Sequence, residues 1–172
     1  QEAISQMIRD AAERKPLSIQ AILNYHLIAM RHEHEIAGKI RTVPVHIKGN
    51  PLFRTAKPGD IGKELDQLIN KYNEFIKRKK VSVEQALKFS VYFHNQFQYI
   101  HPFQDGNSRI TRLLTFHLLQ SSNIPVFDIP FGLLDEYLNN TKGSKQREDR
   151  KLFLSLQKIT LYNLKKINKG IS

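Results

Sequence analysis

The chain has 172 residues, and its 27 lysines and arginines against 16 acidic residues give a formal net charge of +11. This length favours one domain with one buried core, and this charge raises the local concentration of anions such as phosphate. The absence of cysteine excludes disulfides, thiolate nucleophiles and cysteine zinc sites. No apolar run approaches the roughly 20 residues that span a bilayer, and the N-terminus lacks the pattern of a secretory signal. We therefore expect no membrane partner and take the cytoplasm as the default compartment.

No segment of the sequence suggests a domain boundary. There is no internal repeat, no low-complexity segment and no linker that would split the chain, so we expect residues 1–172 to form a single domain. Because the first residue is Gln1 and not methionine, we expect the chain to be a fragment of a longer protein. Further domains or an upstream segment could belong to that protein.

Apolar residues recur at helical spacing over most of the chain, which predicts a mainly α fold. The first two predicted helices are amphipathic, and Ser18 stands where the N-cap of the second is expected. Their inward residues are expected to be Ile4, Met7, Ile8 and Ala11 in the first helix and Ile19, Ile22, Leu23 and His26 in the second.

The segment TVPVHIKGNPLF interrupts the helical pattern. Val43, Val45 and Ile47 alternate with polar residues ahead of a Gly-Asn-Pro turn signal, which predicts a short β-hairpin over about residues 41–54. Pro44 cannot donate a backbone hydrogen bond, so the hairpin belongs at an edge. One side of it would then have backbone groups available to another chain.

Two further helices follow the hairpin. Asp60 is the expected N-cap of a long helix, and Ser82 with Gln85 has the spacing of a capping box that opens the next one. The second of these helices ends at His101, because the residue before Pro102 is pushed out of the α region. The expected inward residues are Leu65, Leu68, Ile69, Tyr72, Phe75 and Ile76, then Ala86, Phe89, Phe93, Phe97 and Ile100.

Residues 107–120 predict a helix with apolar side chains on almost every face, which is typical of a central buried helix. A last helix is expected from about Arg147 to Lys166. Its expected inward residues are Leu152, Phe153, Leu156 and Ile159.

The stretch HPFQDGNSRITR, residues 101–112, combines side chains that suit phosphate chemistry. Gly106 and Asn107 lead straight into a helix, so several backbone N–H groups and the positive end of the helix dipole point at one place, which favours an anion. Arg109 and Arg112 lie three residues apart on neighbouring ridges, where their guanidinium groups can hold phosphate oxygens in pairs. A triphosphate fits this arrangement better than a single phosphate.

Two other residues of this stretch could supply a metal ligand and a base. Asp105 offers the hard oxygen atoms that Mg²⁺ uses when it bridges two phosphates. Histidine is the natural proton acceptor at neutral pH, and His101 enters from the other side of the loop. Each residue alone also has an ordinary structural interpretation, such as a helix-end hydrogen bond or a simple turn. Their combination favours phosphoryl-type transfer.

This stretch resembles the signature of the Fic family, His-Pro-Phe-x-(Asp/Glu)-Gly-Asn-(Gly/Lys)-Arg-x-x-Arg, and matches it at every defined position but one. The hairpin TVPVHIKG is similar to the family's flap, FHNQFQYIHPF to its aromatic-rich approach helix, and LLDEYL more weakly to a downstream segment; the resemblance fades past residue 140. It implies the Fic fold, a helical bundle around a central buried helix with a short β-hairpin flap. The active-site loop and helix would then be residues 101–120.

The resemblance also implies an activity. Fic proteins of this type are protein adenylyltransferases, which move AMP from ATP to a Tyr, Ser or Thr hydroxyl of a target protein, with Mg²⁺ as cofactor. By position in the signature, His101 would deprotonate the hydroxyl, Asp105 would hold Mg²⁺, and Phe103 would anchor the loop. The implied nucleotide-binding residues are Gly106, Asn107, Ser108, Arg109 and Arg112, and the implied target-docking residues of the flap are Val43, Val45 and His46.

The single departure from the signature is Ser108. The family usually has glycine there, or lysine in toxin-like members that are associated with phosphotransfer from a reversed nucleotide. A serine side chain could crowd the phosphates or donate its hydroxyl to one of them. AMP transfer is the favoured reaction, with a Fic-related phosphotransferase as the alternative.

Fic proteins are commonly restrained by a helix with a (Ser/Thr)-x-x-x-Glu-(Gly/Asn) motif, whose glutamate pairs with the final arginine of the signature. We find no such motif in residues 1–172. We therefore expect an inhibitory helix either upstream in the same chain or on a partner.

Two other functional classes are weaker. A basic helical domain could bind nucleic acid through phosphate contacts, but no recognition-helix signature or aromatic–basic interleaving supports this. A two-metal phosphohydrolase needs several carboxylates, and the stretch offers one. The remaining candidates have ordinary interpretations: His32 and His34 as a solvated patch, His94 as packing beneath the loop, His117 as a core histidine, and Tyr137 as either adenine contact or packing.

Overall fold

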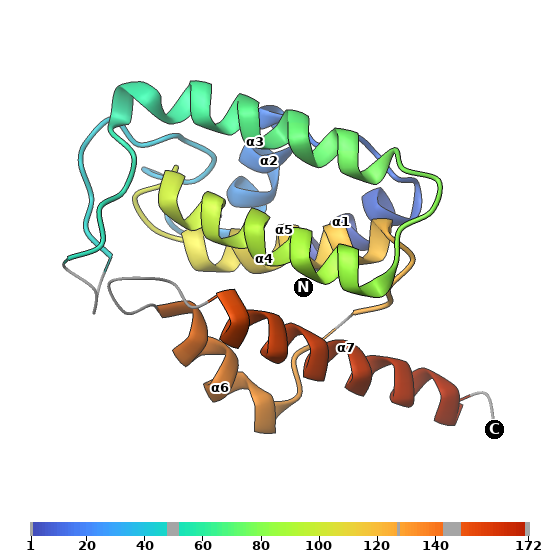
Figure 1. Cartoon of the computed structure of the whole chain (residues 1–172). Coiled ribbons are helices and arrows are strands. Elements are labelled where there is room, and N and C mark those ends of the chain that lie inside the picture. The colour runs from blue at the N-terminus through green and yellow to red at the C-terminus, as the bar shows by residue number, and fades with distance from the viewer. Residues whose placement is uncertain (1, 48–51, 127, 143–148, 171–172) are drawn as a thin grey trace.

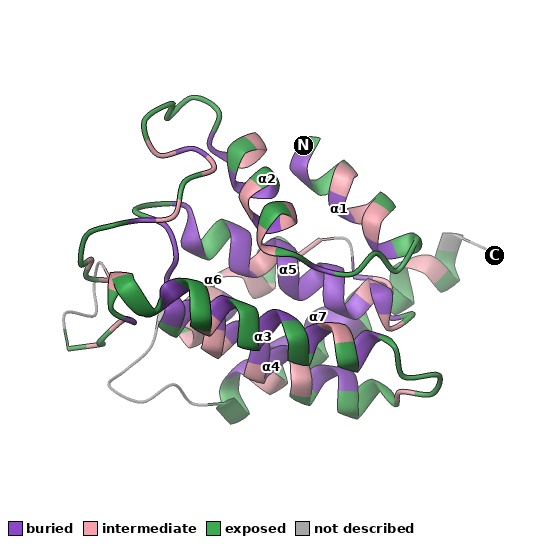
Figure 2. Ribbon diagram, turned by 90° about the horizontal axis from the view of Figure 1, so that it is seen from above, coloured by how far each residue is buried: buried purple, intermediate pink, exposed green. Residues whose placement is uncertain are grey.

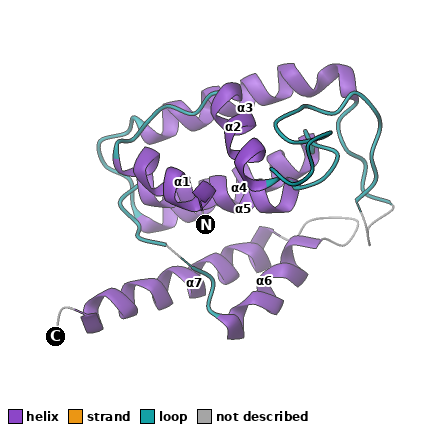
Figure 3. Cartoon of the chain, turned by 180° about the vertical axis from the view of Figure 1, so that it is seen from behind, coloured by secondary structure: helices purple, strands orange, loops and turns teal. Residues whose placement is uncertain are grey.

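The computed structural model describes residues 2–47, 52–126, 128–142 and 149–170, and helices dominate them. Within these ranges seven α-helices and one short 3₁₀ turn follow one another, and Figures 1 and 3 show no strand arrow. None of the described helices combines the length and apolar character needed to cross a bilayer. The elements are α1 (Glu2–Ala12), α2 (Ile19–Ala29), η1 (Pro58–Asp60), α3 (Ile61–Ile76), α4 (Val83–Ile100), α5 (Asn107–Ser121), α6 (Phe131–Lys142) and α7 (Asp149–Gly170). The predicted mainly α fold is confirmed.

Helix α5 is the centre of the molecule. It contacts α1, α2, α3 and α4, and Figure 2 shows it buried over most of its length. Its polar side chains find partners inside the protein: the hydroxyls of Thr111 and Thr115 donate to the carbonyl oxygens of Asn107 and Thr111, each at 2.7 Å. The predicted central buried helix is confirmed, and its burial fixes the position of its own first turn.

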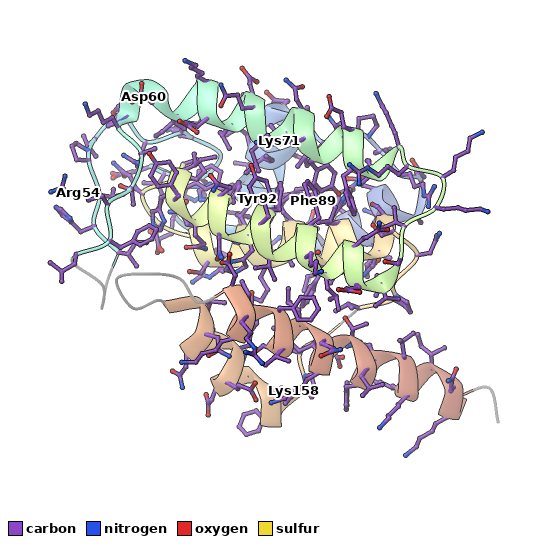
Figure 4. The ribbon with its side chains drawn as sticks, in the orientation of Figure 1. Arg54, Asp60, Lys71, Phe89, Tyr92 and Lys158 are labelled. Atoms are coloured by element: carbon purple, nitrogen blue, oxygen red, sulfur yellow. The ribbon has the colours of Figure 1, made fainter. Side chains whose placement is uncertain are left out.

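Helices α3 and α4 pack through aromatic rings. Phe75 and Phe89 stack with their centroids 4.2 Å apart, and the ring of Tyr92 lies 5.8 Å from that of Phe89. Lys71 of α3 donates to the hydroxyl of Tyr92 at 2.7 Å and lies over its ring, so the two labelled side chains bridge the helices in Figure 4. These contacts hold α4 along its length, and the carboxyl end of α4 leads into residues 101–106.

Local signals determine most helix ends, with one exception. Ser18 caps α2 by accepting from Ala21 N–H at 3.1 Å, and Ser82 with Gln85 forms the predicted capping box of α4. Asp60 precedes α3 but makes no side-chain cap hydrogen bond. Its backbone is in the helical region as the last residue of η1, whereas an N-cap side chain reaches the helix from an extended backbone.

Among the predicted inward residues of the outer helices, Ile4 is wrong. In α1 the buried residues are Ala3, Met7 and Ala11, whereas Ile4 is 46% exposed. Helix α1 contacts α5 and α2, and Ile4 borders the open groove between these three helices. Phe89 and Phe153 are half-buried and pack against the core, as their predicted inward positions require.

Helices α6 and α7 form a hairpin that packs on the bundle through α7 and α4, as the lower layer in Figure 1. Lys158, labelled in Figure 4, joins them by an ion pair to Glu136 at 2.8 Å. Helix α6 was not predicted, because it opens with Phe131 and Gly132 directly after a proline and lacks a clear apolar stripe. The predicted last helix is confirmed as α7, which runs on to Gly170; its predicted first residue, Arg147, lies outside the described residues.

The predicted β-hairpin at residues 41–54 is not seen as regular strands in the described residues. Only Ile47 has a β-bridge, and the predicted turn at 49–51 lies outside the described residues. The carbonyl oxygens that a ladder would use have other donors: Val43 accepts from the Arg41 guanidinium at 2.8 Å, and Val45 accepts from the Thr55 hydroxyl at 3.2 Å. With Pro44 lacking an N–H, the segment keeps an irregular path.

The buried histidine of α5 generates a prediction about acid stability. His117 accepts a hydrogen bond from the hydroxyl of Tyr72, and burial lowers the pKa of His117 to about 4. The unfolded chain takes up this proton near pH 6.5, so between about pH 6.5 and 4 the unfolded state binds more protons. The neutral His117 therefore contributes its full stabilisation above pH 6.5. As the pH falls toward 4, the free energy of unfolding decreases by on the order of 3 kcal/mol.

We expect His117→Gln, which cannot titrate, to show a smaller fall in the free energy of unfolding between pH 7 and pH 4, measured by urea denaturation. The matched control is His32→Gln, because His32 is exposed and its loss should leave the fall unchanged. Equal falls in the parent and in His117→Gln would contradict the assignment.

Candidate active site

The turn between α4 and α5 depends on two residues in left-handed conformation. His101 ends α4 with φ 48° and ψ 59°, and Gly106 precedes α5 with φ 79°. A Cβ on Gly106 would lie 3.0 Å from both His26 Nε2 and Met30 Sδ, so this position needs glycine for space as well as for its φ. The predicted helix-to-loop boundary at His101 is confirmed.

Asn107 holds the two sides of this loop together. Its side-chain nitrogen donates to the carbonyl of Phe103 at 2.7 Å, and its side-chain oxygen accepts from the N–H of Phe103 at 3.0 Å. The side chain of this predicted nucleotide-binding residue therefore holds the loop together. What Asn107 can offer an anion is its backbone N–H, which is among the first of α5 and has no partner within the helix.

His26 of α2 supports the same loop from below. Its ring stacks on Phe103 with centroids 3.7 Å apart and an interplanar angle of 9°. Nδ1 accepts from the N–H of Gly38 at 2.9 Å, so in the neutral ring Nε2 carries the proton and donates to the carbonyl of Asp105 at 3.0 Å. Burial lowers the pKa of His26, which favours this neutral form.

Arg41 connects the loop to the segment of the predicted flap. Its side chain is buried and has no carboxylate partner among the described residues; it donates to backbone carbonyl oxygens only. These acceptors are His101 at 2.6 Å, Ala56 at 2.6 Å, Val43 at 2.8 Å and Ile100 at 3.3 Å, and the Arg41 N–H donates to Pro102 at 2.9 Å. One guanidinium thus holds the left-handed turn at His101 in place.

The orientation of His101 follows from its contact with α4. Its Nδ1 lies 3.2 Å from the carbonyl oxygen of Gln98, which can only accept, so Nδ1 carries the proton in the neutral ring. The lone pair is then on Nε2. Gln98 is itself fixed to α5, because its amide donates to the hydroxyl of Thr111 at 2.6 Å.

A cavity of about 300 Å³ lies over the loop. Of the predicted site residues, His46, His101, Asp105, Gly106, Asn107, Ser108, Arg109 and Arg112 border it. Val43 and Val45 are not among its lining residues. Helix α6 forms the far wall with Tyr137, Leu138 and Thr141. The hydroxyl of Tyr137 lies 3.3 Å from Nε2 of His94 in α4. The cavity therefore combines the predicted stretch with a helix that was not predicted.

The charged residues of the loop are open to solvent. Asp105 is exposed, and its Oδ1 accepts from the N–H of Gly106 at 2.6 Å, while Oδ2 has no partner among the described residues. One carboxylate oxygen at the edge of a phosphate-sized cavity fits Mg²⁺, which commonly takes one or two carboxylates with phosphate and water. In the part of the chain that the structure describes, no three acidic or histidine side chains lie close enough together to hold a metal ion.

The two arginines differ in their surroundings. Arg109 is exposed, and its Nη1 lies 2.9 Å from the sulfur of Met30. Arg112 is half-buried, one helical turn further into α5. Both border the cavity together with the exposed Ser108, so a group bound at the start of α5 is within reach of three side chains.

Comparison with known proteins agrees with this geometry. The model of the Fic/DOC family matches residues 16–119, which is more than half of the chain. The chain belongs to the Fic/DOC family. The protein adenylyltransferase Fic of Nematostella vectensis is 28% identical over 122 residues, which are 70% of this chain and 27% of that relative. The chain thus spans about a quarter of the length of the curated relatives it matches.

Solved Fic structures share the fold. A Fic-domain-containing signalling protein from Bacteroides thetaiotaomicron aligns with a TM-score of 0.77 at 19% identity, covering 95% of this chain and 67% of that one. Fic-1 from C. elegans aligns with a TM-score of 0.76 at 20% identity, covering 98% of this chain and 50% of that one. At these identities the likeness bears on the fold alone, and it confirms the predicted Fic fold.

The contacts of Arg41 predict a large loss of stability when its side chain is removed from this Fic domain. Arg41→Ala leaves several buried carbonyl oxygens without a donor, at about 1–3 kcal/mol each, so we expect a loss of at least about 3 kcal/mol in urea unfolding. Arg41→Lys, which keeps the charge but not the planar fork, should lose less. The control Arg54→Ala, at an exposed position, should stay within about 0.5 kcal/mol. A loss below about 1 kcal/mol for Arg41→Ala would contradict the role given to it.

Proposed function

We propose that this Fic domain is a protein adenylyltransferase, which moves AMP from ATP to the hydroxyl of a Tyr, Ser or Thr side chain in a target protein. The observation that carries the proposal is that His101 with its Nε2 lone pair, the first turn of α5 and two arginines border one cavity. The name of the Nematostella relative, protein adenylyltransferase Fic, supports the same reaction.

His101 is proposed as the general base. Its Nε2 takes the proton of the target hydroxyl, and the hydroxyl oxygen forms a bond to the α-phosphorus of ATP. The bond from this phosphorus to the oxygen bridging the β-phosphate breaks, and pyrophosphate leaves with the electron pair. The carbonyl of Gln98, which accepts from Nδ1–H, stabilises the imidazolium that results.

The phosphates are proposed to lie at the start of α5. The backbone N–H groups of Asn107 and Ser108 face an anion there, and the helix dipole favours its charge. Arg109 and Arg112 would clamp the distal phosphates, and Asp105 would hold Mg²⁺ through its Oδ2. Mg²⁺, when bound, neutralises negative charge on the phosphates.

The target is proposed to dock at the flap segment through Val43, Val45 and His46. The carbonyl oxygens of Val43 and Val45 already accept hydrogen bonds from Arg41 and Thr55. Docking would therefore rest more on the exposed side chains of Val43 and His46 than on a regular β-ladder. His46 also borders the cavity, so a segment bound there would lie beside His101.

A Fic-related phosphotransferase is the second candidate, and Ser108 is the observation that favours it. Its side chain is exposed at the cavity, at the second position of α5, where a phosphate would be closest. A side chain there could shift the nucleotide. We favour AMP transfer, because a serine is small enough to share the first helical turn with a phosphate and can donate its hydroxyl to it.

We also propose that an inhibitory helix, in the same chain or on a partner, restrains the site. A groove of about 390 Å³ lies between α1, α2 and α5, and Arg109 and Arg112 border it beside apolar residues such as Ile28 and Phe116. An amphipathic helix with one carboxylate suits this combination. The carboxylate would occupy Arg112 and so compete with the γ-phosphate of ATP.

The role of His101 predicts loss of transfer without loss of ATP binding. His101→Ala should lower the rate of AMP transfer by roughly 10² to 10⁴-fold, because a positioned general base contributes that much. The measurement is the intact mass of target proteins incubated with Mg·ATP, where a gain of AMP, of phosphate or of nothing separates the candidate reactions. The control is His34→Ala at an exposed position, and a His101→Ala rate equal to that of the parent would overturn the assignment.

The role of Arg112 predicts discrimination between nucleotides. Arg112→Ala should weaken Mg·ATP binding by about 10 to 100-fold, the worth of charge-assisted hydrogen bonds, and AMP binding much less. Isothermal titration calorimetry with ATP and with AMP measures both affinities. The control is Arg150→Ala, at an exposed position of α7. If ATP and AMP lose affinity alike, Arg112 does not contact the distal phosphates.

The side chain of Ser108 predicts which product is formed. Ser108→Gly should keep AMP-modified protein as the product and preserve or raise the rate, since glycine removes a side chain beside the phosphates. Mass spectrometry of the modified target identifies the product. A change from AMP to phosphate, or the reverse, would show that Ser108 sets the orientation of the nucleotide.

A further inference from the structure

A second polar cavity lies at the opposite end of α4 from His101. It has a volume of about 460 Å³ and is bordered by the connection between α3 and α4, the carboxyl end of α5 and Arg14 after α1. Helix α4 has 18 residues, so the two cavities are separated by roughly 27 Å along it. Figure 1 shows the α3–α4 connection and the loop after α4 at opposite ends of the bundle.

Among the described residues, four cationic side chains and no acidic one border this cavity. They are Arg14, Arg78, Lys79 and Lys80. None of the four has an ion pair within the described residues, although Lys15 next to Arg14 has two. The remaining polar lining consists of neutral residues such as Gln85, Ser122 and Asn123.

Helix dipoles account for only part of this positive charge. Helices α1, α3 and α5 end at or near the cavity and α4 begins there. Each helix end carries about half an elementary charge, so three carboxyl ends and one amino end sum to about −1. Against four cations this leaves an excess of about three positive charges, which is more than the capping of helix ends explains.

The shape and lining favour a small anion over a nucleic-acid strand. The cavity is concave, and its volume falls in the range of small-molecule sites. Strand binding by stacking needs exposed aromatic rings, but Phe75 is the single aromatic lining residue, is 3% exposed, and has the guanidinium of Arg78 5.1 Å from its ring centroid. Arg78 is thereby held in a defined position at the rim.

We propose that this cavity binds a small molecule with two or three phosphate groups, at a site separate from the catalytic cavity. An excess of about three positive charges matches a di- or triphosphate and exceeds what a single phosphate neutralises. The guanidinium groups of Arg14 and Arg78 supply paired donors to phosphate oxygens, and Lys79 and Lys80 supply point charges. The site does not depend on the proposed transferase activity.

The test is isothermal titration calorimetry of inorganic tripolyphosphate into Arg112→Ala protein at physiological salt, without Mg²⁺. This background removes Arg112, one of the two arginines proposed for the catalytic cavity, and so weakens binding there. The binding event with the higher affinity is then assigned to the second cavity. We expect Arg14→Gln with Lys80→Gln to weaken this event at least about tenfold, which corresponds to the loss of one charge-assisted hydrogen bond. Lys165→Gln with Lys169→Gln removes the same charge from exposed positions of α7 and should change it by less than about twofold.

Three results would overturn the proposal. Equal weakening of tripolyphosphate binding in both double variants would show that the anion is attracted by the total charge of the protein and not by a specific site. Orthophosphate binding as tightly as tripolyphosphate would exclude recognition of several phosphates. A single-stranded oligonucleotide that binds more tightly and loses affinity in the Arg14 and Lys80 variant would identify a nucleic-acid surface. All four side chains are exposed, so the substitutions at Arg14 and Lys80 should leave the unfolding midpoint unchanged. If the midpoint of that double variant does fall, Lys79→Gln alone provides a second test.

Discussion

The loop of residues 101–106 depends on a ring of contacts that are made by side chains from outside it. Left-handed backbone is costly at His101 unless the surroundings fix it, whereas Gly106 adopts it without strain, and three separate elements hold the loop. His26 holds the loop from α2, Arg41 holds the turn at His101, and Asn107 joins the loop to the first turn of α5. The reaction proposed for this site requires a constant distance between His101 and the amino end of α5. The contacts of His26, Arg41 and Asn107 keep that distance fixed.

The burial of α5 also keeps the loop and the first turn of this helix in place. A central helix cannot move its first turn without disturbing the packing of α1 to α4 around it. Its polar residues extend this rigidity to α4, since Gln98 joins the hydroxyl of Thr111 while its carbonyl accepts from His101. One short chain of hydrogen bonds thus sets the tautomer of His101 and the position of the first turn of α5, where phosphate binding is proposed.

The parts that could be predicted from the sequence are those with short-range causes. The capping box at Ser82, the cap at Ser18 and the end of α4 before Pro102 involve residues within three or four positions of one another, and all were predicted. The central helix was predicted from its all-round apolar pattern. The signature identified the family, because its residues are consecutive.

The parts that could not be predicted depend on long-range contacts. Arg41 is 60 residues from His101 and opens the segment predicted as an edge hairpin, where an arginine is expected to be exposed. His26 is 79 residues from Asp105 and resembles any inward residue of an amphipathic helix. Helix α6, which walls the cavity, begins after a proline and has little apolar pattern of its own. The hairpin expected from alternation was replaced by side-chain donors to the carbonyls of Val43 and Val45. A period-2 pattern in the sequence cannot reveal that side chains will donate to these carbonyl oxygens in place of a neighbouring strand.

The position of Arg41 also bears on how sequence change in the flap segment can be tolerated. Its guanidinium contacts the carbonyls of both Val43 and Ala56, so the two ends of the intervening segment are fixed beside His101 by a single side chain. Doubling the length of a loop with fixed ends costs only about 0.6 kcal/mol in closure entropy. Insertions and deletions between these ends should therefore leave the geometry at His101 intact. The segment can diversify in length and composition while the loop around His101 keeps its conformation.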